Sequence, residues 1–431
     1  MALTTSPTPT RASRARAGVS ALFFVNAVLY ANLVPRLPEV KDRLELSNAA
    51  LGTAIAAMPL GALLAGLLAP VCIQRLGSAK VGALGLVLAA AAVATVPLAN
   101  AWIAFAAVML LVGALDAVVD VAQNAHGFRV QRLYGRSIVN AFHGLWSVGA
   151  VVGGLLGSAA AGAGLPLGAH LTVSAVVFGL VALTAHRFLL PGPEDSERAG
   201  TPRVGPAGVG STDAGDAERA LPADRSGRHR RRAGVRTAAL LAVLGALAAG
   251  GAFVEDAGSS WGALYLRGEL GAGAAVGGLA FVALQGAQTV GRLTGDRVVD
   301  RFGQRRVALT GGLLTAAGTG AALAWPSIPS TLAGFALAGL GVATLVPAVM
   351  HTADELPGLP AGVGLTVVSW LLRVGFLVSP AVVGFVADAT SLRVALLSVV
   401  LAGLLVLVLG RFLAPATGPA DGSAAGSTKR P

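Results

Sequence analysis

Long apolar stretches dominate the sequence and restrict what it can fold into. Twelve of them approach the length of about twenty residues that a helix needs to cross a bilayer. They lie near residues 17–35, 48–70, 79–98, 102–126, 140–163, 169–190, 236–258, 274–293, 306–325, 329–351, 361–386 and 391–413. Only 12% of the residues are charged, whereas soluble domains carry about 25%. We expect an all-α membrane protein with twelve transmembrane helices.

The apolar stretches form two sets of six, separated by a polar segment at 191–235. That segment is rich in Pro, Gly, Asp and Arg, and such a composition cannot bury enough apolar surface to fold alone. We expect an N-terminal six-helix bundle at 17–190, a disordered linker, and a C-terminal six-helix bundle at 236–413. Residues 1–16 and 414–431 are expected to be polar terminal segments.

Most Lys and Arg residues fall in loops on one side of the predicted spans. Positively charged loops stay in the cytoplasm during membrane insertion. The linker and both termini lie on this side when the number of spans is even, so we expect a multi-pass cell-membrane protein with both termini cytoplasmic. The net charge of +11 follows from these loops, and no nucleic-acid partner is expected.

A short segment recurs at an offset of 226 positions. Residues 74–81 read QRLGSAKV and residues 300–307 read DRFGQRRV. Each copy lies between the second and third spans of its set, so the two six-helix bundles are expected to be pseudo-symmetric. Parallel repeats of this kind place a substrate site between the halves, near the middle of the membrane.

The second copy, within GDRVVDRFGQRRV, resembles the signature loop of the major facilitator superfamily. The matching positions are Asp300, Arg301, Gly303, Arg305 and Arg306. The first half retains Arg75, Gly77 and Lys80, with Gln74 where the acid stands in the family. The resemblance implies two rocking helical halves and a gating role for these loops.

Three further segments resemble the YbjJ and MosC branch of that superfamily, which is similar to the fucose permeases. They are PRLPEVKDRLELS, DVAQNAHGFRVQRLYGRSIVNAFHGLWSVG and EDAGSSWGALYLR. The resemblance implies a proton-coupled carrier of a sugar, polyol or similar solute. In fucose permeases an acid in the fourth helix, followed by small residues and an Asn, handles the proton. Asp120 and Asn124 match that pattern, with Asp in place of Glu.

The fourth predicted span carries a polar stripe. Asp116, Asp120 and Asn124 recur at every fourth residue and therefore share one helix face. A charge at mid-bilayer costs about 2.5–3.5 kcal/mol on insertion scales, so each ionisable residue in a span is a functional hypothesis. We expect Asp120 and Asp116 to take part in proton coupling and Asn124 in substrate binding.

The seventh span carries two adjacent acids near its outer end. Adjacent helical residues point in different directions, so we expect at most one of Glu255 and Asp256 to face the cavity fully. Glu255 is the proton-coupling candidate, while Asp256 and Trp261 are substrate-binding candidates. A cap or salt bridge for Asp256, and anchoring at the membrane interface for Trp261, remain open alternatives.

The remaining substrate-binding candidates are pairs of side chains about one helical turn apart. Each pair can hydrogen-bond to a polar solute or stack on it. The pairs are Asn26 with Tyr30, His143 with Trp146, and Trp370 with Arg373. Arg373 is the only basic residue deep in a span and needs a carboxylate or an anionic substrate as its partner.

Several classes of protein are excluded by missing motifs. None of the three lysines follows a glycine, so no ATP-binding loop is present. The sequence has neither an HExxH metal motif nor a GxSxG nucleophile motif, and a single cysteine rules out an internal disulfide. We expect no enzyme activity, no metal and no cofactor. The expected partners of this monomer are lipid, protons and a small-molecule solute.

Two alternatives to solute uptake remain. A proton-driven drug or metabolite efflux pump is the first, and a membrane sensor or scaffold is the second. Gly149, Gly153, Gly154 and Gly157 resemble a degenerate antiporter motif, but we favour close helix packing by small residues as their role.

Overall fold

The computed structural model describes residues 9–134, 138–192, 194, 223–356, 359 and 363–413. Every regular element in these ranges is a helix. Twelve helical segments of the described chain are long and apolar enough to cross a membrane, which confirms the predicted fold class. The predicted tail at 414–431 and most of the predicted linker lie outside these ranges.

The six spans of the N-terminal half are partly built from consecutive helices. They are α1 (Pro9–Ala31) with η1 (Val34–Arg36) and α2 (Leu37–Arg43), α3 (Asn48–Ala65) with η2 (Gly66–Leu68) and α4 (Ala69–Leu76), α5 (Ser78–Ala94) with η3 (Val96–Leu98), α6 (Trp102–Tyr134), α7 (Val139–Gly162) and α8 (Leu167–His186). Prolines stand at the first turn of η1, α2, α4 and η3, where their missing N–H costs nothing.

The C-terminal half has the same order. Its spans are α9 (Ala223–Gly268), α10 (Ala274–Phe302), α11 (Gln304–Ala324), α12 (Ile328–Val342) with α13 (Leu345–Asp354), α14 (Val363–Ala389), and α15 (Leu392–Ala395) with α16 (Leu397–Leu409) and η5 (Gly410–Phe412). Helix α9 begins at Ala223, within the predicted disordered linker, and Ala and Arg, which are frequent in this stretch, are good helix formers.

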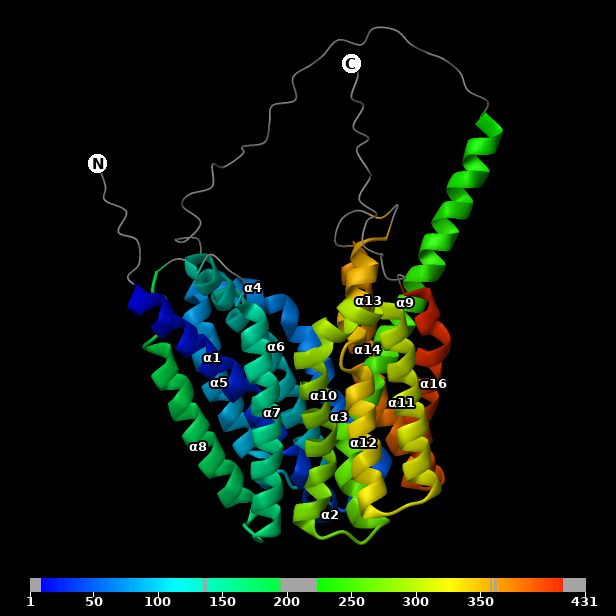
Figure 1. The fold of residues 1–431 in the computed structure, drawn as a ribbon. Helices are drawn as coiled ribbons and strands as arrows, with labels where there is room; N and C mark the ends of the chain where they lie inside the picture. The colour runs from blue at the N-terminus through cyan, green and yellow to red at the C-terminus, as the bar shows by residue number, and fades with distance from the viewer. Residues whose placement is uncertain are drawn as a thin grey trace, which may run out of the picture.

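Figure 1 shows the two sets of six helices side by side, and α1 begins at the same end of the molecule where α16 ends. The backbone repeats between them. Gly77 has φ 83° and ψ 146°, and its counterpart Gly303 has φ 81° and ψ 149°. This left-handed conformation favours glycine. Both glycines turn the chain directly before the third span of their half.

The two halves pack against each other through α3 with α14 and α7 with α10. Small residues allow the close approach: a Cβ at Gly52 would overlap the carbonyl of Pro380, and one at Gly278 would overlap the hydroxyl of Ser158. Both contacts lie toward the end of the molecule away from the start of α1. The halves are therefore closed against each other at that end, which we call the outer end.

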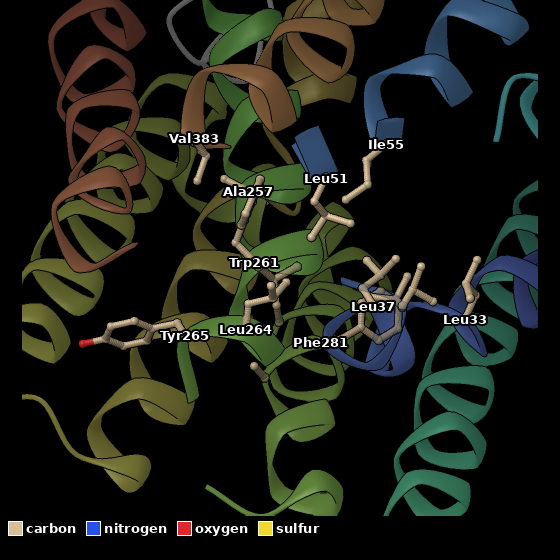
Figure 2. Close-up of a cluster of buried hydrophobic side chains, with 14 of the residues drawn as sticks. Leu33, Leu37, Leu51, Ile55, Ala257, Trp261, Leu264, Tyr265, Phe281 and Val383 are labelled. Carbon is tan, nitrogen blue, oxygen red and sulfur yellow. The ribbon is translucent and has the colours of Figure 1, made fainter. Parts of the chain in front are cut away.

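A hydrophobic cluster completes this closure. Figure 2 shows Leu51 and Ile55 of α3 facing Trp261 of α9 and Val383 of α14, beside Phe281 of α10. Side chains from both halves contribute to the one cluster. Ile55 and Phe281 of this cluster also line the cavity described below.

The glycines of α7 pack against α1. A Cβ at Gly149 would lie 2.5 Å from the carbonyl oxygen of Phe24, and one at Gly153 would lie 2.8 Å from that of Val28. Close packing between two helices of the same half therefore requires these glycines, as the small-residue interpretation predicts.

Candidate functional site

A cavity of about 330 Å³ lies between the two halves. Helices α1, α3, α6 and α7 form one wall, and α9, α10 and α14 form the other. Seven of the predicted site residues line it: Asn26, Tyr30, Asp116, Trp146, Glu255, Asp256 and Arg373. The cavity lies where the repeat predicted a substrate site.

A chain of hydrogen bonds crosses the N-terminal wall and joins three helices. Trp146 of α7 donates from Nε1 to Oδ1 of Asn26 at 2.8 Å, and Asn26 of α1 donates from Nδ2 to Oδ1 of Asp116 at 2.9 Å. The amide of Asn26 uses its acceptor on one side and its donor on the other. The carboxylate of Asp116 is therefore held in a fixed position at the cavity wall.

Asp120 lies one turn farther along α6, away from the outer end. Its Oδ1 accepts hydrogen bonds from Asn124 Nδ2 at 3.0 Å and from Gln123 Nε2 at 3.4 Å. Asp120 is exposed and does not line the cavity itself. It is close enough to Asp116 and to His143 of α7 for electrostatic interaction. The two acids of α6 therefore follow each other along one face, from the cavity toward the end where α1 begins.

The adjacent acids of α9 both line the cavity but have different partners. Glu255 Oε2 accepts from Gln288 Nε2 at 2.8 Å and forms a 3.4 Å salt bridge with Arg292, both on α10. Asp256 Oδ1 accepts from the hydroxyl of Ser260 at 3.2 Å, and Asp256 shares no hydrogen bond with Gln288 or Arg292. Glu255 is therefore held by α10, while Asp256 is held within its own helix by Ser260.

Arg373 of α14 is the cation of the cavity. Its side chain is exposed, and it makes no salt bridge with any residue that the structure describes. It interacts electrostatically with Asp116 and Asp120 across the gap between the halves. This arginine therefore faces the acids of the opposite half without being neutralised by direct contact.

The structure places two predicted aromatic residues elsewhere. Trp261 is fully buried in the hydrophobic cluster at the outer end (Figure 2) and does not line the cavity. Trp370 is 50% exposed and also lies outside the cavity lining. His143 packs edge-on against Phe23, with ring centroids 5.1 Å apart, and is exposed beside Asp120.

The predicted gating loops lie at the end of the molecule where α1 begins. Their charged side chains are exposed and make no salt bridge within the described part of the chain. These side chains belong to Arg75, Lys80, Asp300, Arg301, Arg305 and Arg306. The shared glycine conformation at Gly77 and Gly303 sets the direction of both loops.

Sequence reasoning overlooked several polar residues of the C-terminal wall. Ser259, Ser260 and Gln285 line the cavity, and Gln288 and Arg292 hold Glu255. A signal for three of them was available: Gln285, Gln288 and Arg292 are spaced by three and four residues in an otherwise apolar span, which places them on one helix face.

Comparison with known proteins identifies the family. A family model described as Major Facilitator Superfamily matches residues 241–431. An uncharacterized MFS-type transporter of Yersinia pestis is 30% identical over 86% of this chain and 89% of its own length. Membrane protein MosC of Rhizobium meliloti is 30% identical over 89% of this chain and 86% of its own length.

Solved structures share the fold at low identity. The nucleoside transporter NupG superposes with a TM-score of 0.66 at 15% identity, covering 92% of this chain and 98% of that one. A bacterial homolog to the human lysosomal transporter Spinster gives 0.67 at 15%, covering 93% and 95%. The transporter FucP gives 0.55 at 18%, covering 92% and 98%. These structures share the fold, and the relatives at 30% identity over most of the chain show that it belongs to the major facilitator superfamily.

Proposed function

We propose that this transporter is a proton-coupled carrier of a small polar organic solute, such as a sugar or polyol, and that it works by alternating access. The observation that carries the proposal is the cavity between the halves, where fixed carboxylates on α6 and α9 face an unpaired arginine on α14. Charged groups at this depth are costly, so a transport task is the simplest reason to keep them.

The size and lining of the cavity favour a small polar solute. Its volume of about 330 Å³ is at the lower end of the range of about 300–1,000 Å³ for small-molecule sites. Arg373 offers donors, and the carboxyl groups of Asp116 and Asp256 supply acceptors in the lining. Tyr30, Trp146 and Phe281 supply aromatic surface on which the C–H faces of a sugar can stack. A solute with several hydroxyl groups satisfies these groups together.

The two acids of α6 support the proton coupling. Asp116 lines the cavity, while Asp120 is exposed, so a proton that reaches Asp120 from water is one helical turn from Asp116. Neutralising these acids changes their interaction with Arg373 of the opposite half. Protonation therefore alters the attraction between the two halves. A potential of 100 mV supplies about 2.3 kcal/mol per charge moved, which corresponds to roughly fiftyfold accumulation.

The proposal includes the orientation in the membrane. The basic loops and both ends of the described chain lie at the end of the molecule opposite the closed outer end. The positive-inside tendency then makes this end cytoplasmic and the closed end extracellular. We place the protein in the cell membrane as a monomer, with the segment between the halves as a cytoplasmic linker.

Proteoliposomes that contain a pH-sensitive dye test the proposal. A panel of sugars, polyols, nucleosides and cationic drugs is added to wild type, Asp116→Asn, Asp120→Asn and the control Asp42→Asn, which changes an exposed outer acid. We expect one class of neutral polar solute to drive protons into the vesicles, with loss of the signal in both α6 variants and not in the control.

Other results would point elsewhere. Proton movement with cationic drugs alone would indicate efflux. Solute uptake without proton movement would reject the coupling. Binding of a solute without any transport would favour a sensor.

A further inference from the structure

A second and larger cavity, of about 680 Å³, lies at the end of the N-terminal half where α1 begins, which the proposed orientation makes cytoplasmic, away from the cavity between the halves. It is formed by the start of α1, the turn between α4 and α5, the end of α6 and the residues that follow α8. None of the residues proposed for solute binding lines it. Solute binding between the halves therefore gives this cavity no role.

The cavity is strongly basic. It is lined by Arg11, Arg14, Lys80, Arg129 and Arg187, and Glu194 is the acid among its lining residues. Like charges gathered in one concave surface repel each other and raise the local concentration of anions. The charge pattern therefore indicates a negatively charged ligand.

One of these cations, Arg129, is already paired with a carboxylate, and that carboxylate shows where an anion can bind in the cavity. Arg129 is buried, with its guanidinium 3.2 Å from the carbonyl oxygen of Pro191 and 3.4 Å from Oε1 of Glu194. The same Oε1 accepts from the backbone N–H of Ser78, at the start of α5, at 2.6 Å. Gly77, with φ 83°, turns the chain directly before this N–H, and both Gly77 and Glu194 line the cavity. A carboxylate oxygen thus lies between a helix N-terminus and an arginine.

The other four cations are not neutralised. Arg11, Arg14, Lys80 and Arg187 are exposed and make no salt bridge or side-chain hydrogen bond with any residue that the structure describes. Glu194 already interacts with Arg129 and Ser78. The cavity therefore has positive charge in excess after its internal pairing is complete.

Apolar side chains border the same cavity. Leu76 is 58% exposed and Phe188 is 45% exposed, and both belong to the lining. Basic pockets between helices at the cytoplasmic surface bind the headgroups of anionic lipids. Exposed apolar groups next to the cations are suited to the acyl chains of such a lipid.

We propose that this cavity is a binding site for a phosphate-bearing anion, which is held by Arg11, Arg14, Lys80 and Arg187. The phosphate can belong to the headgroup of an anionic lipid or to a soluble phosphate compound, since both present the same oxygen acceptors to these side chains. The apolar border favours the lipid.

Native mass spectrometry of the detergent-purified full chain tests the proposal. Phosphatidylglycerol, phosphatidylcholine, inorganic phosphate and glycerol phosphate are titrated separately. The test variant combines Arg11→Gln, Arg14→Gln and Lys80→Gln. The control combines Arg297→Gln, Arg301→Gln and Arg305→Gln, which removes the same charge from exposed positions at the same end of the other half.

We expect wild type to bind phosphatidylglycerol saturably and more tightly than phosphatidylcholine. Each basic residue near an anionic lipid contributes about a fivefold factor in affinity. The triple test variant should therefore weaken binding at least tenfold, while the control triple variant leaves it unchanged. If inorganic phosphate competes with phosphatidylglycerol and glycerol phosphate binds as tightly as the lipid, the anion site stands and its ligand is a soluble phosphate compound.

Two results would overturn the proposal. The first is that none of the phosphate-bearing probes binds saturably to wild type. The second is that both triple variants lose phosphatidylglycerol equally, which would show a general effect of net charge. Because the three substituted side chains are exposed, the variants should elute as wild type in size exclusion, and this check separates lost binding from misfolding.

Discussion

The carboxylate of Asp388, near the end of α14, accepts a hydrogen bond from the backbone N–H of Asn48, the first residue of α3, at 2.8 Å. Its second oxygen accepts from the N–H of Ala49, also at 2.8 Å. An acid of the C-terminal half therefore caps a helix of the N-terminal half at the closed outer end. At the pseudo-symmetric contact, Gly162 packs on Ala275 without any carboxylate.

Opening of the outer end requires this contact to break, since α3 and α14 belong to different halves. A negative cap at a helix N-terminus stabilises by about 1 kcal/mol. Asp388→Asn should therefore shift the equilibrium toward outward-open states by about fivefold. Spin labels at Asp42→Cys and Thr390→Cys, in a Cys72→Ser background, report the separation by pulsed electron resonance.

Asp354→Asn serves as the control for this shift, because Asp354 is an exposed acid at the opposite end of the molecule. The expected result is a larger population of long distances in the Asp388 variant alone. Identical distance distributions in wild type and Asp388→Asn would mean that the cap does not hold the outer end closed.

The hydrogen bonds from Trp146 through Asn26 to Asp116 predict that substitution of Asn26 reduces transport more than substitution of Trp146. Asn26→Leu leaves both a carboxylate oxygen and an indole N–H without a partner, and an unsatisfied buried polar group costs about 1–3 kcal/mol. Trp146→Phe removes only one donor and keeps an aromatic ring. Proton-coupled uptake should therefore fall by about tenfold or more in Asn26→Leu, and less in Trp146→Phe.

Proton-coupled uptake by the two variants is compared through the initial rates of dye response in proteoliposomes, normalised to the amount of reconstituted protein. Trp325→Phe is the control, because Trp325 is 76% exposed and far from the cavity lining. A larger loss in Trp146→Phe than in Asn26→Leu would contradict the proposed role of the Asn26 amide in holding Asp116.

The polar stripe of the fourth span shows what periodicity predicts about the site. The four-residue spacing places Asp116, Asp120 and Asn124 on one face, and the structure agrees, since Asn124 hydrogen-bonds back to Asp120. Periodicity gives no information on depth, however. Only Asp116 lines the cavity, because the level at which the halves separate depends on packing across the interface, between residues distant in the sequence.

The seventh span shows the limit of single-sequence reasoning more clearly. The difference between Glu255 and Asp256 comes from Gln288 and Arg292 on α10, which pair with Glu255 alone. No pattern within α9 contains that information. Trp261 is likewise buried by residues of the other half, so its place in the core follows from the closed outer end and not from its own helix.

Helix packing in the N-terminal half gives a prediction for stability. A Cβ at Gly113 of α6 would overlap the backbone carbonyl of Met58 of α3, whereas a Cβ at Gly179 of α8 meets nothing within 4 Å. Overpacking costs about 1–3 kcal/mol, while Gly→Ala in an open helix position stabilises by up to about 1 kcal/mol. Gly113→Ala should lower the apparent Tm in detergent, and Gly179→Ala should keep or raise it. Equal Tm values for the two variants would show that α3 and α6 can separate without cost.

A buried arginine at the outer end gives the last prediction. Arg36 is 1% exposed; it donates to the carbonyl of Leu165 at 2.7 Å and to Glu39 at 2.8 Å, and lies 3.3 Å from Nδ1 of His170. These bonds tie the end of the first span to the start of α8. Arg36→Met leaves the Leu165 carbonyl and the His170 ring without this partner, at a cost of about 1–3 kcal/mol for unsatisfied buried groups.

Glu39→Gln should cost much less, because Glu39 is 40% exposed and water can replace the lost interaction. Thermal unfolding followed by tryptophan fluorescence should therefore give a clearly lower apparent Tm for Arg36→Met, and values near wild type for Glu39→Gln and for the control Lys41→Met. If Glu39→Gln lowered the Tm as much as Arg36→Met, the ion pair would stabilise this end. If Arg36→Met lowers the Tm and Glu39→Gln does not, the contacts of Arg36 with Leu165 and His170 stabilise this end, and the ion pair with Glu39 does not.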